Sequence, residues 1–445
     1  MSSDSRRSLL GRVSGDKSRL SAAALGSMAV AGTGTVLRFA LQIVLARGMG
    51  SSGYGLFVTY RGWGELLATL PNRGYQAVVV RTLPAYADVG AGRRYHQLVR
   101  HSLRTVAIGG AAIAGVSMAS VAVAGSAEPG LYLGLISVPL WALLRMVQAV
   151  LQAQHRYALG TLLADVMQPA LLGLVVGVIW LVDRQLGPAT AVGALLVSVG
   201  SSALLSYLLA RREFPDPTSS VERAEQDPGP WPSPRPFFVA HLAIAVLGMA
   251  DVLILAMFVT PAEVALYAIA SRIANLGRMV NSSLESVASA RIAAAWAKLD
   301  TVAIQTLVNR SIALGSVLTI ILVTPLVIFR GSILGLVGEE YRGAATALIV
   351  LLIGNMVSAF TGPAGYVVAL TGGQVIHARV MAAAAVALVA GCLVFGSLGI
   401  VAVAAVRAAT TFGWNAALVI DSRARLGVAC YPNRGFLTLL GKPAS

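Results

Sequence analysis

Long apolar stretches alternate with short polar links along almost the whole chain. The apolar windows fall at residues 25–46, 56–72, 105–124, 131–150, 161–182, 189–210, 237–259, 264–288, 311–329, 346–370, 380–396 and 400–420. A helix that crosses a bilayer needs about 20 mostly apolar residues. The pattern therefore predicts an all-α polytopic membrane protein with about twelve transmembrane helices.

The middle of the chain breaks this pattern. Segment 211–236 holds seven prolines and mixed charge, which is typical of a semi-rigid linker. We expect a first six-helix bundle at 25–210 and a second at 237–420. Short terminal tails at 1–24 and 421–445 complete the predicted organisation.

Composition and charge support this class. Of the residues, 56% are apolar and only 12% are charged, whereas soluble proteins carry about 25% charge. The formal net charge of +15 could suggest nucleic-acid binding, but the cations lie in short links between apolar windows. Of 34 Lys and Arg residues, 24 lie on the side that also holds the N-terminus and only 4 in the opposite links. By the positive-inside rule, both termini are predicted to be cytoplasmic in a multi-pass cytoplasmic membrane protein.

The two halves resemble each other at a spacing of about 210 residues. Arg81 matches Arg291 and Arg100 matches Arg310 at an offset of 210, and the same offset lays the second window over the eighth. A parallel repeat of six plus six helices places a substrate path between the halves, near the middle of the bilayer.

Charged residues within the windows form the candidate site. A charge at the centre of a span costs at least about 2.5–3.5 kcal/mol on insertion scales, so it is usually paired or faces a cavity. Several polar residues repeat at helical spacing and make continuous stripes, which indicate a hydrated cavity. The stripes comprise Thr35, Arg38 and Gln42; Arg61 and Glu65; Arg145, Gln148, Gln152 and His155; Ser271, Asn275, Arg278, Ser282 and Glu285; and Arg407, Thr411 and Trp414.

The excess of arginine in these spans indicates an anionic cargo, because a guanidinium binds phosphate and pyrophosphate through paired hydrogen bonds. The predicted substrate-binding residues are Arg38, Arg61, Arg145, Gln148, Gln152, Arg272, Asn275, Arg278 and Arg407. The predicted ion-coupling or salt-bridge switch residues are Asp251, Glu65 and Glu285. Structural pairing remains an alternative for Arg61 with Glu65 and for Arg278 with Glu285.

Other chemistry is missing from the sequence. There is no P-loop for ATP, no HExxH motif and no Cys/His cluster for a metal. The two cysteines, Cys392 and Cys430, are not spaced as a redox or metal motif. No cofactor and no enzymatic activity are predicted.

Segment 45–88 carries a family resemblance. Leu45, Ala46, Arg47, Gly50, Tyr54 and Gly55 form the pattern LAR-x-x-G-x-x-x-Y-G, and Arg81, Leu83, Pro84 and Tyr86 form R-x-L-P-x-Y. Both patterns resemble Wzx-type polysaccharide flippases of the multidrug/oligosaccharidyl-lipid/polysaccharide (MOP) exporter superfamily. The resemblance implies two MATE-like bundles around a central cavity and alternating access. It also implies transfer of an undecaprenyl-pyrophosphate-linked oligosaccharide, a precursor for polysaccharide or lipopolysaccharide biosynthesis, from the inner to the outer leaflet.

The same resemblance implies coupling to a proton or sodium gradient, contact with membrane lipids, and a polysaccharide polymerase or ligase as candidate protein partners. Four alternatives stay open. They are an ion-coupled exporter of drugs or metabolites, a major-facilitator transporter, a membrane polymerase or ligase, and a scaffold without transport. The segment from Asn72 to Arg104 lacks the major-facilitator link motif, and the longest outer link, about 330–345, is short for a catalytic loop.

Overall fold

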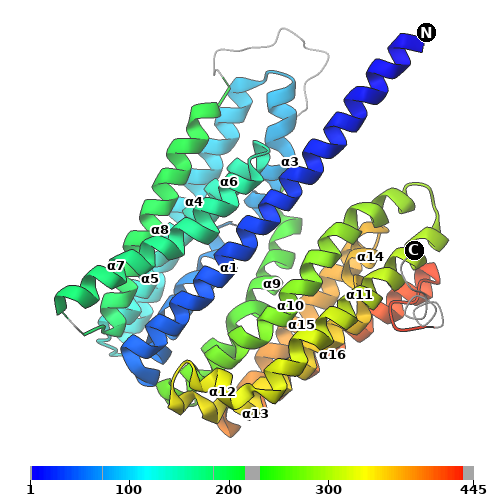
Figure 1. The fold of residues 1–445 in the computed structure, drawn as a ribbon. Helices are drawn as coiled ribbons and strands as arrows, with labels where there is room; N and C mark the ends of the chain where they lie inside the picture. The colour runs from blue at the N-terminus through cyan, green and yellow to red at the C-terminus, as the bar shows by residue number, and fades with distance from the viewer. Residues whose placement is uncertain (1–2, 73, 184, 216–230, 434–445) are drawn as a thin grey trace. The chain divides into compact units, whose positions relative to one another are not determined.

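The computed structural model describes residues 3–72, 74–183, 185–215 and 231–433. Every regular element in these ranges is helical (Figure 1). The chain forms two compact units. Unit 1 comprises residues 1–42, 70–186 and 190–235, and unit 2 comprises residues 43–69, 187–189 and 236–445.

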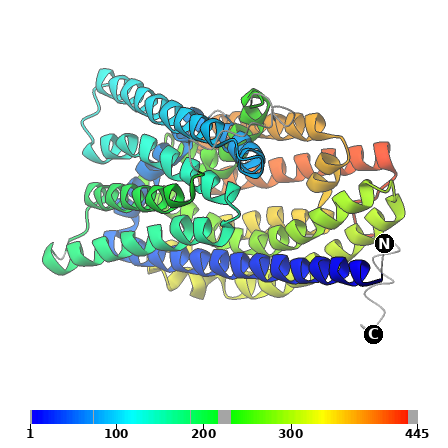
Figure 2. The ribbon, with the colours of Figure 1, turned by 90° about the horizontal axis from the view of Figure 1, so that it is seen from above.

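Unit 1 is built from one long helix and a set of shorter ones. Its elements are the first part of α1 (Ser3–Leu67), α3 (Tyr75–Asp88), α4 (Gly92–Val123), α5 (Pro129–Ala153), α6 (Tyr157–Thr161), the π-helix η1 (Leu162–Met167), α7 (Gln168–Asp183), α8 (Pro188–Ala210) and η2 (Arg211–Glu213). α4 packs along α5, as both ribbon views show (Figures 1 and 2). The predicted linker falls largely outside the described residues.

Unit 2 holds the remaining helices. They are the second part of α1, α9 (Arg235–Leu255), α10 (Pro261–Trp296), α11 (Thr301–Ile328), α12 (Arg330–Gly335), η4 (Glu339–Ala344), α13 (Ala345–Thr361), α14 (Ala364–Leu370), α15 (Gln374–Phe395), η5 (Gly396–Leu398) and α16 (Ile400–Leu426). The short α2 (Thr69–Asn72) lies at the boundary between the units. α10 contacts α11 and α13, and α16 contacts α13 and α15.

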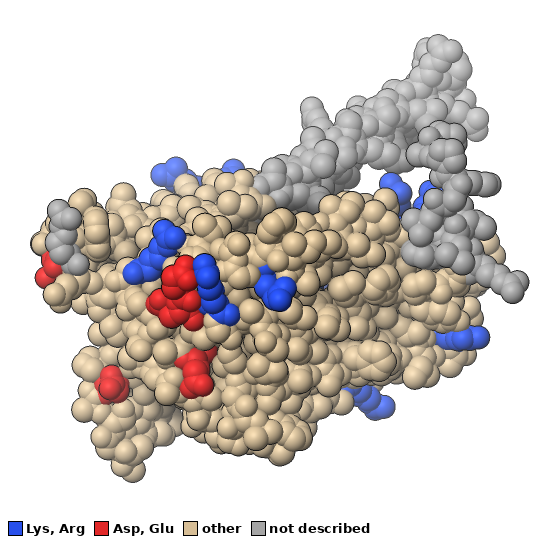
Figure 3. Space-filling view, turned by 60° about the horizontal axis from the view of Figure 1, so that its bottom comes forward, with Lys and Arg blue, Asp and Glu red and all other residues tan. Residues whose placement is uncertain are grey.

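The helical membrane class predicted from hydropathy is confirmed. Among the described residues, nine helices are long and apolar enough to cross a bilayer. The three predicted windows outside this set, 25–46, 56–72 and 264–288, lie on α1 and α10. α10 carries the longest polar stripe, and its charged residues lower its hydropathy. A helix, α3, also forms within 73–104, where the hydropathy pattern predicts a link. One face of the molecule shows charged side chains only in small groups on a mostly uncharged surface (Figure 3).

The second predicted window packs differently from the expected organisation. We expected residues 56–72 to belong to the first bundle, but residues 43–69 are part of unit 2. The helical path breaks at Gly50, which has a φ of 68°. Beyond this break, the helix approaches unit 2 closely at glycines. A Cβ on Gly55 would collide with the carbonyl of Pro261, and one on Gly62 would press on Leu253.

The internal repeat reappears in the bounds of the helices. η1 and α7 together run from Leu162 to Asp183, and α15 runs from Gln374 to Phe395, which is 212 residues later at both ends. α8 and α16 also begin 212 residues apart. The offset of these helices is therefore within two residues of the offset of 210 at which the residues match.

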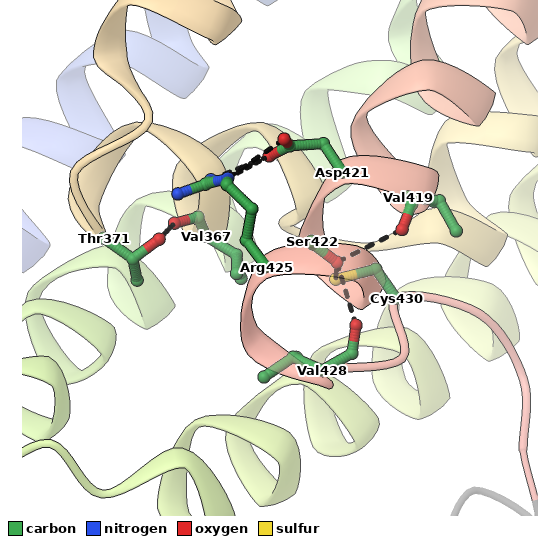
Figure 4. Close-up of polar contacts among 8 residues, drawn as sticks. All are labelled: Val367, Thr371, Val419, Asp421, Ser422, Arg425, Val428 and Cys430. Carbon is green, nitrogen blue, oxygen red and sulfur yellow. Dashed lines mark hydrogen bonds and ion pairs between the residues drawn. The ribbon is translucent and has the colours of Figure 1, made fainter.

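Hydrogen bonds hold the segment after α16 against the helices of unit 2. Gln305 of α11 donates from Nε2 to the carbonyl oxygen of Ala429 at 3.0 Å, and its Oε1 accepts from the Ala429 amide at 2.7 Å. Ser422 of α16 donates to the carbonyl oxygen of Val428 at 2.9 Å and lies 3.3 Å from the Cys430 sulfur (Figure 4). Cys430 is fully buried, and this burial raises the pKa of its thiol to about 11.

Candidate functional site

α10 carries the longest of the predicted polar stripes. Its start is fixed by a capping box, in which Thr260 Oγ1 accepts from the Glu263 amide and Glu263 Oε2 accepts from the Thr260 amide at 3.0 Å. Pro261 follows at the first helical turn, where a missing N–H leaves no hydrogen bond unmade. The helix then continues without a break to Trp296. This continuity keeps residues three and four apart on one face.

Most of the stripe faces away from the core of unit 2. Of its five residues, Arg278 and Ser282 are exposed, Asn275 and Glu285 are half-buried, and Ser271 is buried. Arg272 lies beside the stripe and is also exposed. The part of the stripe from Asn275 to Glu285 is therefore at least partly accessible.

Hydrogen bonds hold the buried face of α10 in place. Asn281 Nδ2 donates to Thr319 Oγ1 of α11 at 3.1 Å. Asn355 Nδ2 of α13 donates to the carbonyl oxygen of Ala274 at 2.9 Å. These amides fix the rotation of α10 and hence the direction of the stripe. The sequence analysis did not identify them, because their role depends on which neighbouring helix each one meets.

A buried ion pair joins α9 to α16. Arg407 Nη1 lies 2.7 Å from Asp251 Oδ2 and 2.9 Å from the carbonyl oxygen of Leu247. Tyr267 of α10 donates from its hydroxyl to the same Asp251 Oδ2 at 2.7 Å. The side chain of Asp251 is 1% exposed and that of Arg407 is 11% exposed. The structure thus brings together a predicted coupling residue and a predicted substrate-binding residue, and adds Tyr267, which the site prediction missed.

In unit 1, Arg38 of α1 is also ion-paired. Its Nη1 lies 2.5 Å from Asp165 Oδ1, with both side chains about one-third exposed or less. Asp165 sits in η1, a π-helix, and such bulges are frequently found at functional sites. A Cβ on Gly34 would collide with the carbonyl of Asp165, so the glycine allows α1 to approach the bulge. Arg38 had no acidic partner on its own helix, and its partner comes from a distant one.

Arg61 and Glu65 pair along their own helix. Arg61 Nη2 lies 2.8 Å from Glu65 Oε1 at a spacing of four residues. Both side chains are largely buried, at 16% and 11% exposure. The structural pairing that the sequence left as an alternative is the arrangement observed for this couple.

The α5 stripe is more enclosed. Arg145, Gln148 and Gln152 are half-buried on this helix. The Arg145 guanidinium lies 5.9 Å from the centroid of the Trp141 ring, which is within range for a cation–π contact.

The remaining predicted pair is not formed. Arg278 and Glu285 make no ion pair with each other, and Arg278 has neither a hydrogen bond nor an ion pair within the described part of the chain. Within that same part, no three His, Cys, Asp or Glu residues lie close enough together to hold a metal ion. In each unit, some predicted arginines are therefore held by carboxylates, namely Arg38 in unit 1 and Arg61 and Arg407 in unit 2, whereas Arg278 of unit 2 is accessible.

No protein-family model and no curated protein matches this sequence. Solved structures do match it over nearly their whole length. An inward-facing multidrug resistance MATE family transporter of the MOP superfamily aligns with a TM-score of 0.67 at 15% identity, covering 91% of this chain and 98% of that one. The lipid II flippase MurJ, in an inward closed conformation, aligns with a TM-score of 0.68 at 12% identity, covering 93% and 89%.

A third match is also a transporter of the MOP superfamily. This MOP superfamily transporter from Pyrococcus furiosus, described as having a binding pocket of reverse polarity, aligns with a TM-score of 0.61 at 14% identity. It covers 91% of this chain and 94% of that one. The chain therefore has the MATE-like fold of the MOP superfamily transporters.

Proposed function

We propose that the protein is a membrane transporter that flips a lipid-pyrophosphate-linked oligosaccharide from the inner to the outer leaflet of the cytoplasmic membrane by alternating access. The observation that supports this most strongly is the accessible part of the stripe on α10, where Arg278 is exposed on a helix of a MATE-like fold, with the exposed Arg272 beside the stripe. A transport path for an anionic head group needs positive charge that is both accessible and deep in the membrane.

Arg278 meets both conditions. It is two residues from the middle of the predicted span 264–288, which is about 3 Å along a helix axis. A cation at this depth costs at least about 2.5–3.5 kcal/mol on insertion scales. An anionic cargo that binds the guanidinium through paired hydrogen bonds would offset this cost.

The other predicted residues take graded roles in this proposal. Arg272 and Asn275 extend the binding surface along α10. Arg145, Gln148 and Gln152 offer hydrogen bonds to sugar hydroxyls. Arg38, Arg61 and Arg407 are already held by carboxylates. Each would bind cargo only by leaving its carboxylate, so each ion pair would act as a switch between a paired and a cargo-bound state. The predicted coupling residues are Glu65, Asp251 and Glu285.

The proposal includes the orientation and partners expected from the sequence. Both termini lie in the cytoplasm, the path opens to membrane lipids so that the polyprenyl tail stays in the bilayer, and an ion gradient drives the cycle. A polysaccharide polymerase or ligase would then use the flipped precursor.

An exporter of drugs or metabolites is the second candidate, because one structural neighbour is a multidrug transporter. The cationic stripe favours anionic substrates for either function.

Binding of a polyprenyl pyrophosphate to the purified protein tests the proposal. Loss of a hydrogen bond to a charged group costs about 1.5–3 kcal/mol, so Arg278→Ala should weaken binding roughly 10- to 100-fold. The matched control is Arg330→Ala, which removes an exposed arginine that donates to the carbonyl oxygen of Val327 in the preceding helix. Equal affinity of the Arg278 variant and the wild type for the lipid would contradict the proposed role of the stripe.

A further inference from the structure

The ion pair between α9 and α16 has the ligand arrangement of a cation site. A single nitrogen of Arg407, Nη1, lies within 2.9 Å of two oxygens, Asp251 Oδ2 and the carbonyl oxygen of Leu247. The hydroxyl of Tyr267 also meets Asp251 Oδ2, at 2.7 Å. A carboxylate, a main-chain carbonyl and a hydroxyl are the hard oxygen ligands that hard metal cations take.

The carboxylate of Asp251 requires a positive charge. The residue is fully buried, and an isolated carboxylate is very unfavourable in an apolar interior. Its second oxygen, Oδ1, is buried and makes no hydrogen bond within the described residues. Arg407 is the ion-pair partner that the structure gives to this carboxylate, so its guanidinium supplies the neutralising charge.

We infer that Arg407 is a tethered cation that occupies the cation position of Asp251, so that this carboxylate binds no sodium ion in the native protein. A second cation beside a guanidinium in a low-dielectric interior would be strongly repelled. Removal of the guanidinium leaves Asp251 Oδ2 and the Leu247 carbonyl oxygen beside the space it filled, and the Tyr267 hydroxyl remains bonded to the same carboxylate oxygen. That space then becomes a site for a small monovalent cation, with sodium as the cation of matching charge and hardness.

This inference deepens the proposed coupling role of Asp251 and rests on that part of the proposed function alone. A sodium gradient would not act through Asp251. Coupling at this position would instead follow the exchange of Arg407 between Asp251 and another anion.

The test uses the full-length purified protein in detergent or nanodiscs, with no cargo present. Sodium binding is measured with radioactive sodium, and unfolding temperature is measured in NaCl against choline chloride at equal ionic strength. We expect the wild type to bind no sodium at Asp251 and to show no sodium-specific shift. Arg407→Ala should gain saturable sodium binding and a sodium-dependent rise in unfolding temperature. The double variant Arg407→Ala/Asp251→Asn should lose both.

A second variant protects the test against misfolding. Arg407→Gln keeps an amide donor for the Leu247 carbonyl while removing the charge, and it should also gain the sodium response. Sodium binding by the wild type that Asp251→Asn abolishes would overturn the inference. A folded Arg407 variant without any sodium response would overturn it as well. Because no cargo is used, these results are independent of whether Arg278 binds a pyrophosphate lipid.

Discussion

The hydrogen bonds between Gln305 and the segment after α16 should determine how often this segment opens. Gln305→Ala removes two hydrogen bonds to Ala429, at 3.0 and 2.7 Å, and leaves the amide and carbonyl of Ala429 without this partner. A hydrogen bond contributes about 0.5–1.5 kcal/mol net. Local opening of the segment should therefore become easier by about 2 kcal/mol, which is roughly a 30-fold larger open population.

Maleimide labelling of Cys430 reports this opening. Burial raises the pKa of the Cys430 thiol to about 11 in the folded protein, whereas a free thiol has a pKa of about 8.5. At pH 7.5 the folded state therefore presents far less thiolate than an exposed cysteine would, and its sulfur is buried from a reagent in solution. Labelling at this pH consequently proceeds through the open state, so its rate follows the open population.

The assay uses a variant that keeps Cys430 as its single cysteine. Gln305→Ala should label roughly 30-fold faster at pH 7.5, with a rate that levels off above about pH 8.5 because the open thiol is then ionised. The control is Thr306→Ala on the same helix, since Thr306 donates its hydroxyl hydrogen bond to the Val302 carbonyl of its own helix. A labelling rate changed less than about 3-fold by Gln305→Ala would refute the reasoning, because two hydrogen bonds of ordinary strength would then hold nothing in place.

Two further substitutions test the packing of unit 2. Asp251→Asn leaves the guanidinium of Arg407 buried without its carboxylate and should destabilise the protein by about 3 kcal/mol or more. Thermal unfolding and a double-mutant cycle with Arg407→Gln measure this loss. Single variants within about 1 kcal/mol of the wild type would show that the pair is not buried as described. Gly55→Ala should destabilise by about 1–3 kcal/mol because its Cβ meets the Pro261 carbonyl. Gly115→Ala, where a Cβ meets nothing within 4 Å, should be neutral or stabilising, and equal effects of the two glycine variants would argue against the close approach.

The hydropathy pattern predicted the fold well because bilayer thickness fixes the length of each apolar helix. All twelve windows fall on helices, and Gly362 ends α13 before α14 begins at Ala364. The packing of residues 43–69 with unit 2 was not predicted, because it depends on the close contacts at Gly55 and Gly62. Glycine in an apolar helix does not reveal which backbone it will meet.

The sequence also predicts some contacts of the candidate site residues better than others. Asp251 and Arg407 each lie three residues from the middle of their windows, toward the predicted outer side. The sequence therefore places both at the same depth, about 4.5 Å from the middle of the span. Arg38 and Asp165 lie about 13 Å apart in depth by the same arithmetic. Asp165 lies in a π-helix that α1 approaches closely at Gly34, and hydropathy windows report neither feature.

The sequence pattern predicted a helix here, and the unbroken α10 preserves the spacing that keeps Asn275, Arg278 and Ser282 on one face. Its accessibility required the structure. Asn281 lies on the same helix, yet it is buried against Thr319. The sequence alone could not separate the polar residues that hold the helix from those that remain accessible to a cargo.

Leaflet transfer in proteoliposomes tests the central claim most directly. A labelled undecaprenyl-pyrophosphate oligosaccharide is placed in both leaflets, and its accessibility to an impermeant enzyme is followed over time. Lipid in the inner leaflet of the vesicles is at first protected from the enzyme. We expect the wild type to make this lipid accessible over time. Arg278→Ala should strongly slow the transfer at equal protein content, and Arg330→Ala should not. Protected lipid that stays protected in the presence of folded wild-type protein, across imposed proton and sodium gradients, would contradict the claim that this protein flips such a lipid.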